Sequence, residues 1–218
     1  MNNPKLNLPV LLAARICHDL ISPVGAINNG LELMQMSGDL SGPEAGLIAD
    51  SAENATARLR YYRLAFGMYG SGQTISGNEL ASIVTSHYSE AGFTVQMNAA
   101  DGMTRTRAQV VFLLLMCCET AVMRRGSVMV NGLGHIECTG QSPLTQHGLI
   151  GDLVQDNDWP TDLGAADVHF PLARAALIAN GLRLNCDRHD RTLTLWTEPA
   201  LPDLQINREP SRPRRQGT

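Results

Sequence analysis

The sequence predicts an α+β protein in which an N-terminal αα-hairpin forms a dimeric four-helix bundle and is followed by an α/β sandwich. Apolar residues recur at alternating steps of three and four over the first third of the chain. Shorter helical and strand patterns follow from about residue 73. A composition of 44% hydrophobic and 17% charged residues suits a packed core. We therefore expect a hairpin at residues 1–72, a sandwich at residues 73–202 and a disordered tail at residues 203–218.

Two long helices account for the first third. The first carries a heptad seam whose apolar members are Val10, Ala13, Cys17, Leu20, Val24, Ile27, Leu31 and Met34. The second begins near Pro43 and continues the pattern through Ile48, Ala52, Ala55, Leu59, Tyr62, Phe66 and Tyr69, before Gly70 and Gly72 end it. The two segments form an antiparallel αα-hairpin.

A hairpin of this length leaves one side of its apolar stripe in water. Self-association into a four-helix bundle is the simplest way to cover that side. The residues expected in the dimer seam are Leu20, Val24, Ile27, Leu31, Leu59, Tyr62 and Phe66. The alternative is that the rest of the chain covers the stripe in a monomer.

The remainder of the chain shows shorter, mixed elements. Helices are expected at residues 77–91 and 105–125, after Pro143, and from a cap at Asp167 to Asn180. Strands are expected at residues 93–97, 127–131 and 135–139, with a closing hairpin at residues 182–186 and 192–197. Helices combined with a largely antiparallel sheet give an α/β sandwich.

His18 is the first candidate for chemistry. It follows an a position of the heptad, so it points away from the seam toward solvent. Small and apolar residues share its surroundings and would let another protein approach. This expected partner-binding face consists of Leu11, Ala14, Arg15, Ile21, Ser22 and Gly25. The alternative is that His18 is one surface histidine among many.

Asp19 is the second candidate. Its carboxylate can accept a hydrogen bond from one ring nitrogen of His18 and so fix the imidazole tautomer. It can equally be a solvated charge on the helix surface, and the sequence does not separate these two roles.

Composition excludes several classes of function. A net charge of −4 argues against a dedicated nucleic-acid binder. Lys5 is the only lysine, which nearly excludes lysine nucleophiles and a P-loop. The five cysteines form no C-x-x-C pair, as in a reduced cytoplasmic protein, and His and Cys spacings match no metal site. We expect neither a signal peptide nor a membrane segment, because the longest apolar run spans only residues 110–118.

The segment Arg15-Ile-Cys-His-Asp-Leu-Ile-Ser-Pro-Val-Gly-Ala-Ile-Asn-Asn-Gly-Leu-Glu-Leu resembles the H-box helix of two-component histidine kinases. The Gly-Ala-Ile-Asn-Asn-Gly string after the proline is more specific and is similar to bacterial histidine phosphotransferases of the ChpT type. That resemblance implies a homodimeric hairpin followed by a degenerate relative of the histidine-kinase ATPase (Bergerat) fold.

The resemblance also implies a function. His18 would be the phosphoacceptor of a His-Asp phosphotransferase that relays phosphate from the receiver domain of a hybrid histidine kinase to response regulators. Mg²⁺ would be bound by the partner receiver and no cofactor by this chain. The setting would be a bacterial phosphorelay in the cytoplasm, with no nucleic acid and no membrane involved.

Two further interpretations remain beside the relay. An ATP-dependent histidine kinase would need an Asn-rich helix and a Gly-rich motif. Residues 110–126 contain no asparagine and residues 162–174 contain no Gly-x-Gly, so we expect no ATP use. A non-enzymatic adaptor could dock regulators through Leu11 and Ile21 without turnover.

Overall fold

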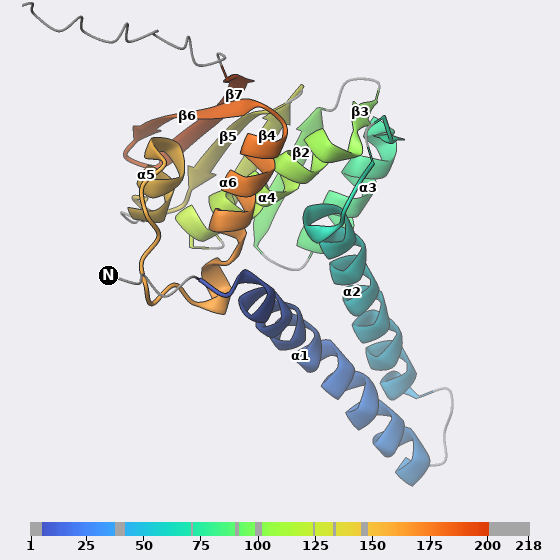
Figure 1. Ribbon diagram of the computed structural model, residues 1–218. Helices are drawn as coiled ribbons and strands as arrows, with labels where there is room; N and C mark the ends of the chain where they lie inside the picture. Colours follow the sequence, from blue (N-terminus) through green and yellow to red (C-terminus); the bar gives the residue numbers. More distant parts are fainter. Residues whose placement is uncertain are drawn as a thin grey trace, which may run out of the picture.

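The computed structural model describes residues 6–37, 42–70, 72–89, 92–98, 102–123, 125–132, 134–144 and 148–200. A helical hairpin projects from an α/β body, and its far end points away from the sheet (Figure 1). This mixed architecture, with N-terminal helices and a mixed sheet, confirms the predicted α+β class. The predicted tail at residues 203–218 lies outside the described residues.

The hairpin consists of α1 (Leu8–Ser37) and α2 (Pro43–Phe66). Pro23 lies inside α1, and the helix continues past it to Ser37. The two helices approach closely at Gly30, where a Cβ atom would lie 2.6 Å from Cγ1 of Ile48. A residue without a side chain therefore sets the spacing of the hairpin at this point.

The second helix ends earlier than the heptad pattern predicts. The pattern runs to Tyr69, whereas α2 stops at Phe66 and Gly67 is extended. The side-chain amide of Gln109 donates hydrogen bonds to the carbonyls of Ala65 and Gly67, at 3.1 and 2.9 Å. These bonds satisfy carbonyls that another helical turn would otherwise use.

The main sheet has five strands in the order β2-β4-β5-β7-β6. Their bounds are β2 (Phe93–Asn98), β4 (Gly126–Asn131), β5 (His135–Gly140), β7 (Thr192–Pro199) and β6 (Leu182–His189). Strands β2 and β4 are parallel, and the other pairs are antiparallel. Strands β1 (Thr74–Ile75) and β3 (Met103–Thr104) form a separate antiparallel pair that the sequence pattern does not predict.

Helices cover one face of the main sheet (Figure 1). They are α3 (Gly77–Tyr88), α4 (Arg105–Ala121), α5 (Gly148–Gln155) and α6 (His169–Ala179), with a short 3-10 turn η1 (Ala165–Asp167) before α6. Ser76 and Thr104 cap α3 and α4 by accepting hydrogen bonds from the backbone N–H groups of Glu79 and Arg107. The α4 helix is the centre of the core, because most of its residues are buried.

Other helix boundaries also differ from the prediction. Helix α3 ends at Tyr88, before the predicted residue 91. Helix α4 ends at Ala121, because Met123 adopts a left-handed backbone with φ of 53°. Helix α6 begins at His169 with Val168 as its N-cap, so the prediction that Asp167 caps it is wrong. Asp167 lies in η1 instead.

The hydrophobic core crosses the predicted boundary near residue 72. Tyr61 is fully buried, and its hydroxyl donates to the carbonyl of Phe112 in α4 at 2.8 Å. Leu64 and Ala65 belong to the same buried cluster as the sheet residues. The C-terminal end of α2 thus fixes the hairpin on the α/β body.

Within the described residues, α1 alone is long and apolar enough to cross a membrane by length and composition. A helix that packs its apolar face against protein meets the same criterion. The charged and polar side chains of Arg15, His18 and Asp19 lie in the N-terminal half of this helix.

Candidate phosphoacceptor site

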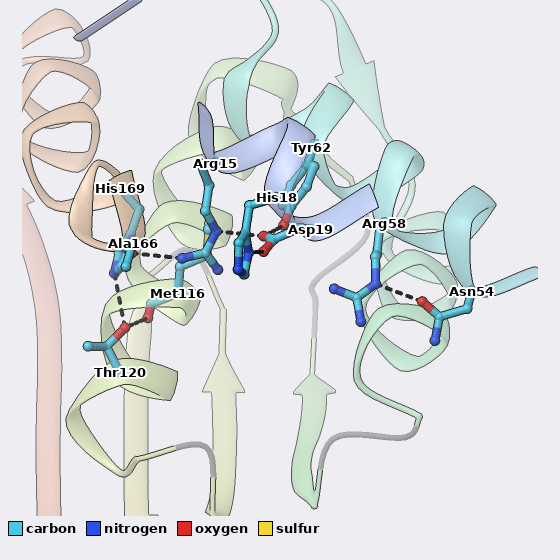
Figure 2. Close-up of polar contacts among 10 residues, drawn as sticks. All are labelled: Arg15, His18, Asp19, Asn54, Arg58, Tyr62, Met116, Thr120, Ala166 and His169. Carbon is cyan, nitrogen blue, oxygen red and sulfur yellow. Dashed lines mark hydrogen bonds and ion pairs between the residues drawn. The ribbon is translucent and has the colours of Figure 1, made fainter. Parts of the chain in front are cut away.

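The side chain of His18 projects from α1 into solvent and is 84% exposed, in agreement with its predicted orientation. Its Nδ1 atom lies 3.0 Å from Oδ1 of Asp19 (Figure 2). An ionised carboxylate only accepts hydrogen bonds, so Nδ1 carries the proton in this contact. The lone pair of the neutral ring then lies on Nε2.

Asp19 is buried although it follows an exposed residue. Its Oδ2 atom accepts hydrogen bonds from Nε of Arg15, at 2.5 Å, and from the hydroxyl of Tyr62 on α2 (Figure 2). Asp19 is therefore bonded to His18 and to two interior side chains, and it is not a solvated charge.

The charge state of Asp19 follows from these contacts. Burial alone would raise the pKa of the Asp19 carboxyl, but hydrogen bonds from Tyr62 and His18 and the charge of Arg15 outweigh it and lower that pKa. Burial and the adjacent carboxylate raise the pKa of the Tyr62 hydroxyl. Asp19 is consequently ionised and Tyr62 neutral at pH 7.

Tyr62 corrects one prediction. The heptad pattern assigns it to the dimer seam, but its side chain is only 5% exposed and points at Asp19 within the same chain. The apolar surface of a helix is wider than a single heptad seam, and Tyr62 lies on the part of α2 that faces α1 of the same chain.

Arg15 corrects a second prediction. The sequence pattern places it on the partner-binding face, but its side chain is only 10% exposed. Its Nη1 atom donates a 2.8 Å hydrogen bond to the carbonyl of Ala166 in η1 (Figure 2). One guanidinium therefore joins the Asp19 carboxylate to the α/β body.

The other residues of the predicted partner-binding face remain accessible to different degrees. Ile21 is 72% exposed, and Ala14 and Ser22 are also exposed. Leu11 and Gly25 are half-buried, and a Cβ atom added to Gly25 would meet nothing within 4 Å. The surface near His18 thus combines a large apolar side chain with small neighbours.

The predicted seam residues apart from Tyr62 keep part of their surface open on the hairpin. Val24, Leu31 and Leu59 are 48%, 43% and 52% exposed. Leu20, Ile27 and Phe66 are half-buried. An apolar strip therefore remains uncovered on the single chain.

An aromatic cluster lies behind the site, and no pattern in the sequence predicts it. The ring of His87 on α3 stacks on Tyr61 with centroids 4.0 Å apart and meets Tyr62 edge-on at 6.0 Å. Burial, with the charge of Arg58, lowers the pKa of His87 to about 3. His87 is therefore neutral at pH 7 and contributes to packing.

No group of three or more His, Cys, Asp or Glu side chains is arranged to hold a metal ion in the described parts of the chain. Elsewhere, Oγ1 of Thr120 on α4 lies 3.2 Å from Nε2 of the buried His169, at the start of α6 (Figure 2). The two segments that would carry nucleotide motifs in a kinase are thus in direct contact.

Comparison with known proteins decides the family. Residues 77–192, more than half of the chain, match the family model described as the histidine phosphotransferase C-terminal domain. The chain belongs to the histidine phosphotransferase family. This finding confirms the resemblance that the H-box segment carries.

Two relatives of this chain agree with that assignment. One is the protein phosphotransferase ChpT of Brucella abortus (strain 2308), 39% identical over 128 residues. The aligned segment covers 57% of this chain and spans 60% of that relative's length. The other is the solved structure of a bacterial phosphotransferase, with a TM-score of 0.71, 25% identity, and coverage of 91% of this chain and 98% of that one.

Proposed function

We propose that this phosphotransferase relays a phosphoryl group between receiver-domain aspartates through phosphohistidine at His18, without using ATP. The observation that supports it is the exposed imidazole of His18, whose Nδ1 is held by a buried carboxylate at 3.0 Å. A nucleophilic nitrogen needs a lone pair, access and a fixed direction, and this arrangement supplies all three.

The chemistry proceeds in two balanced halves. The Nε2 lone pair of His18 attacks phosphorus of a receiver aspartyl phosphate, a P–N bond forms, and the P–O bond breaks as the aspartate carboxylate leaves with its electron pair. The ring becomes a phosphoimidazolium that keeps its Nδ1 proton beside the Asp19 carboxylate. In the second half, a carboxylate oxygen of another receiver attacks phosphorus, and the P–N electron pair returns to Nε2.

The receiver partners are proposed to dock on the surface around His18. Ile21 supplies an exposed apolar contact there, Leu11 a half-buried one, and Ala14, Ser22 and Gly25 leave room for a second backbone. A partner of this kind brings Mg²⁺ and a charge-stabilising lysine with its own aspartate. This chain then needs to bind no metal and no cofactor.

The hairpin at residues 1–72 is proposed to dimerise into a four-helix bundle, with the sandwich at residues 73–202 outside it. The uncovered apolar strip supports this arrangement, because a second copy would bury the exposed side chains of Val24, Leu31 and Leu59. The same burial accounts for the apolar character of α1 without a membrane, so we place the protein in the cytoplasm.

The relay is preferred to an ATP-dependent kinase on one structural observation. His169 is buried and lies 3.2 Å from Thr120, so a side chain links α4 and α6 directly. Together with the missing asparagine and Gly-x-Gly motifs, this contact supports a sandwich that works without nucleotide.

A relay assay tests the proposal. Several receiver domains are phosphorylated with a small phosphodonor and mixed with the protein. A second, unphosphorylated receiver domain is then added. Wild type should accept the label and pass it on, and His18→Gln should do neither. His189→Gln is the matched control, since His189 is 76% exposed at the end of β6, far along the chain.

Acceptance of label by His18→Gln at the wild-type rate would contradict the assignment of His18. If wild type bound receivers but never took up label, the protein would be a non-enzymatic adaptor and the relay would be abandoned.

A further inference from the structure

We propose that Arg15 and Tyr62 are positioning residues that lock the Asp19 carboxylate, so that the α/β body sets the tautomer and direction of the His18 ring. This inference rests on the proposed phosphotransfer through His18. It gives the second domain a task in the reaction that requires no nucleotide.

The two oxygens of Asp19 have separate partners. Arg15 and Tyr62 both donate to Oδ2, whereas Oδ1 faces Nδ1 of His18 (Figure 2). Adjacent helix residues diverge by about 100°, so this contact depends on a carboxylate held in one rotamer. The occupation of Oδ2 leaves Oδ1 as the acceptor for the ring proton.

Arg15 connects this carboxylate to the second domain. Its side chain is only 10% exposed, and a buried guanidinium is costly unless its donors are matched by acceptors. Nε bonds Asp19 at 2.5 Å and Nη1 bonds the carbonyl of Ala166 at 2.8 Å, 151 positions further along the chain. The planar fork of arginine serves both acceptors, and an ammonium group on one flexible stem does not.

Tyr62 holds the same oxygen from the other side. Its ring contacts Phe66, with centroids 5.2 Å apart, and His87 of α3 at 6.0 Å. Its hydroxyl reaches Asp19 from this packed aromatic setting. Arg15 therefore connects the carboxylate to η1, and Tyr62 connects it to α2 and α3. Both connections fix the direction of the His18 ring through Asp19.

Ring ¹⁵N NMR of His18 provides a readout that a merely structural role would not move. In wild type we expect the Nδ1–H tautomer to dominate. In Tyr62→Phe and in Arg15→Lys we expect the Nε2–H tautomer to rise, with phosphotransfer about tenfold slower. Tyr69→Phe is the matched control, because the Tyr69 hydroxyl bonds the carbonyl of Arg63 and not Asp19. Circular dichroism and thermal unfolding identify any variant that is not folded.

The outcomes separate this inference from the proposed function. An unchanged tautomer ratio in both folded variants would overturn the positioning role even if phosphotransfer proceeds. A wild-type tautomer ratio and transfer rate in Arg15→Lys alone would also overturn it. If either variant fails to fold, tautomer measurement in the other decides. A shifted tautomer ratio in variants of a protein that never accepts phosphate would support the positioning geometry and refute the relay.

Discussion

His18 and Asp19 are neighbours in the sequence, yet their side chains are 84% and 7% exposed. In the proposed relay, that difference suits His18 to act as the nucleophile and Asp19 as its anchor. The sequence predicts the exposure of His18 from the heptad and leaves Asp19 undecided. Arg15 and Tyr62, the residues that bind the Asp19 carboxylate, are predicted to lie on other surfaces. For Arg15 the reason is that its contact with Ala166 spans 151 positions, which no local sequence pattern connects.

Asp19→Asn is expected to destabilise the fold by about 3–5 kcal/mol at pH 7, because the buried Arg15 loses its counter-charge. The lowered pKa of Asp19 also fixes a pH dependence. The contribution of the ionised Asp19 carboxylate to the free energy of unfolding is fully present above the usual Asp pKa of about 3.9. It is lost as the pH falls below that value. Urea denaturation from pH 7 to pH 3 measures both effects. A wild type and an Asp19→Asn variant with parallel acid profiles would contradict the account.

His87 gives a second pH dependence in a different window. Burial lowers its pKa to about 3, so the folded state resists protonation that the unfolded chain accepts below about 6.5. The contribution of His87 to the free energy of unfolding is then full above that pH and falls toward pH 4 by up to about 1.4 kcal/mol per pH unit. His87→Phe keeps a ring against Tyr61 and removes the titration. Its stability should fall less than that of wild type over the range from about pH 6.5 to about pH 4.5, and an equal fall would refute the burial effect.

At the scale of the element, periodicity predicts α1 and the strands of the main sheet, because apolar residues recur in each at the period of a helix or of a strand. It fails where a distant group ends an element. Helix α2 stops at Phe66 because Gln109 bonds the carbonyl of Gly67, 42 positions away. Strands β1 and β3 have two residues each, too few to show any alternation.

The hairpin itself is testable through two glycines. At Gly46 an added Cβ atom meets nothing within 4 Å, so Gly46→Ala should raise the free energy of unfolding by up to about 1 kcal/mol. At Gly30 the same atom would lie 2.6 Å from Ile48, and overpacking costs about 1–3 kcal/mol. Gly30→Ala should therefore be less stable than Gly46→Ala by at least about 1 kcal/mol. Equal denaturation midpoints in urea would mean that the helices are not in contact there.

At the scale of the whole molecule, the α/β body and the hairpin share one core, and the family model matches most of the body. The sequence predicts both parts, but it does not predict that Tyr61 and Arg15 fasten one to the other. The strip left open on the hairpin is the surface on which the proposed dimer depends.

The proposed dimer predicts a mass of twice the 23.6 kDa of one chain by light scattering. Val24→Glu combined with Leu59→Glu places two carboxylates in the apolar strip. Burying these charges in a dimer interface is unfavourable, so the double variant should be a folded monomer. Ile178→Glu is the matched control, because Ile178 is 66% exposed on α6 and lines a hollow with residues of α5, β6 and β7. A wild type that is monomeric, or a double variant that stays dimeric, would contradict this arrangement.

The most direct measurement is to map the phosphorylated residue after the protein is loaded from a phosphorylated receiver. Peptides prepared at alkaline pH preserve phosphohistidine, and acid treatment removes it. We predict an acid-labile phosphoryl group on the peptide that contains His18 and on no other histidine peptide. An acid-stable label, or a label on any residue other than His18, would contradict the account.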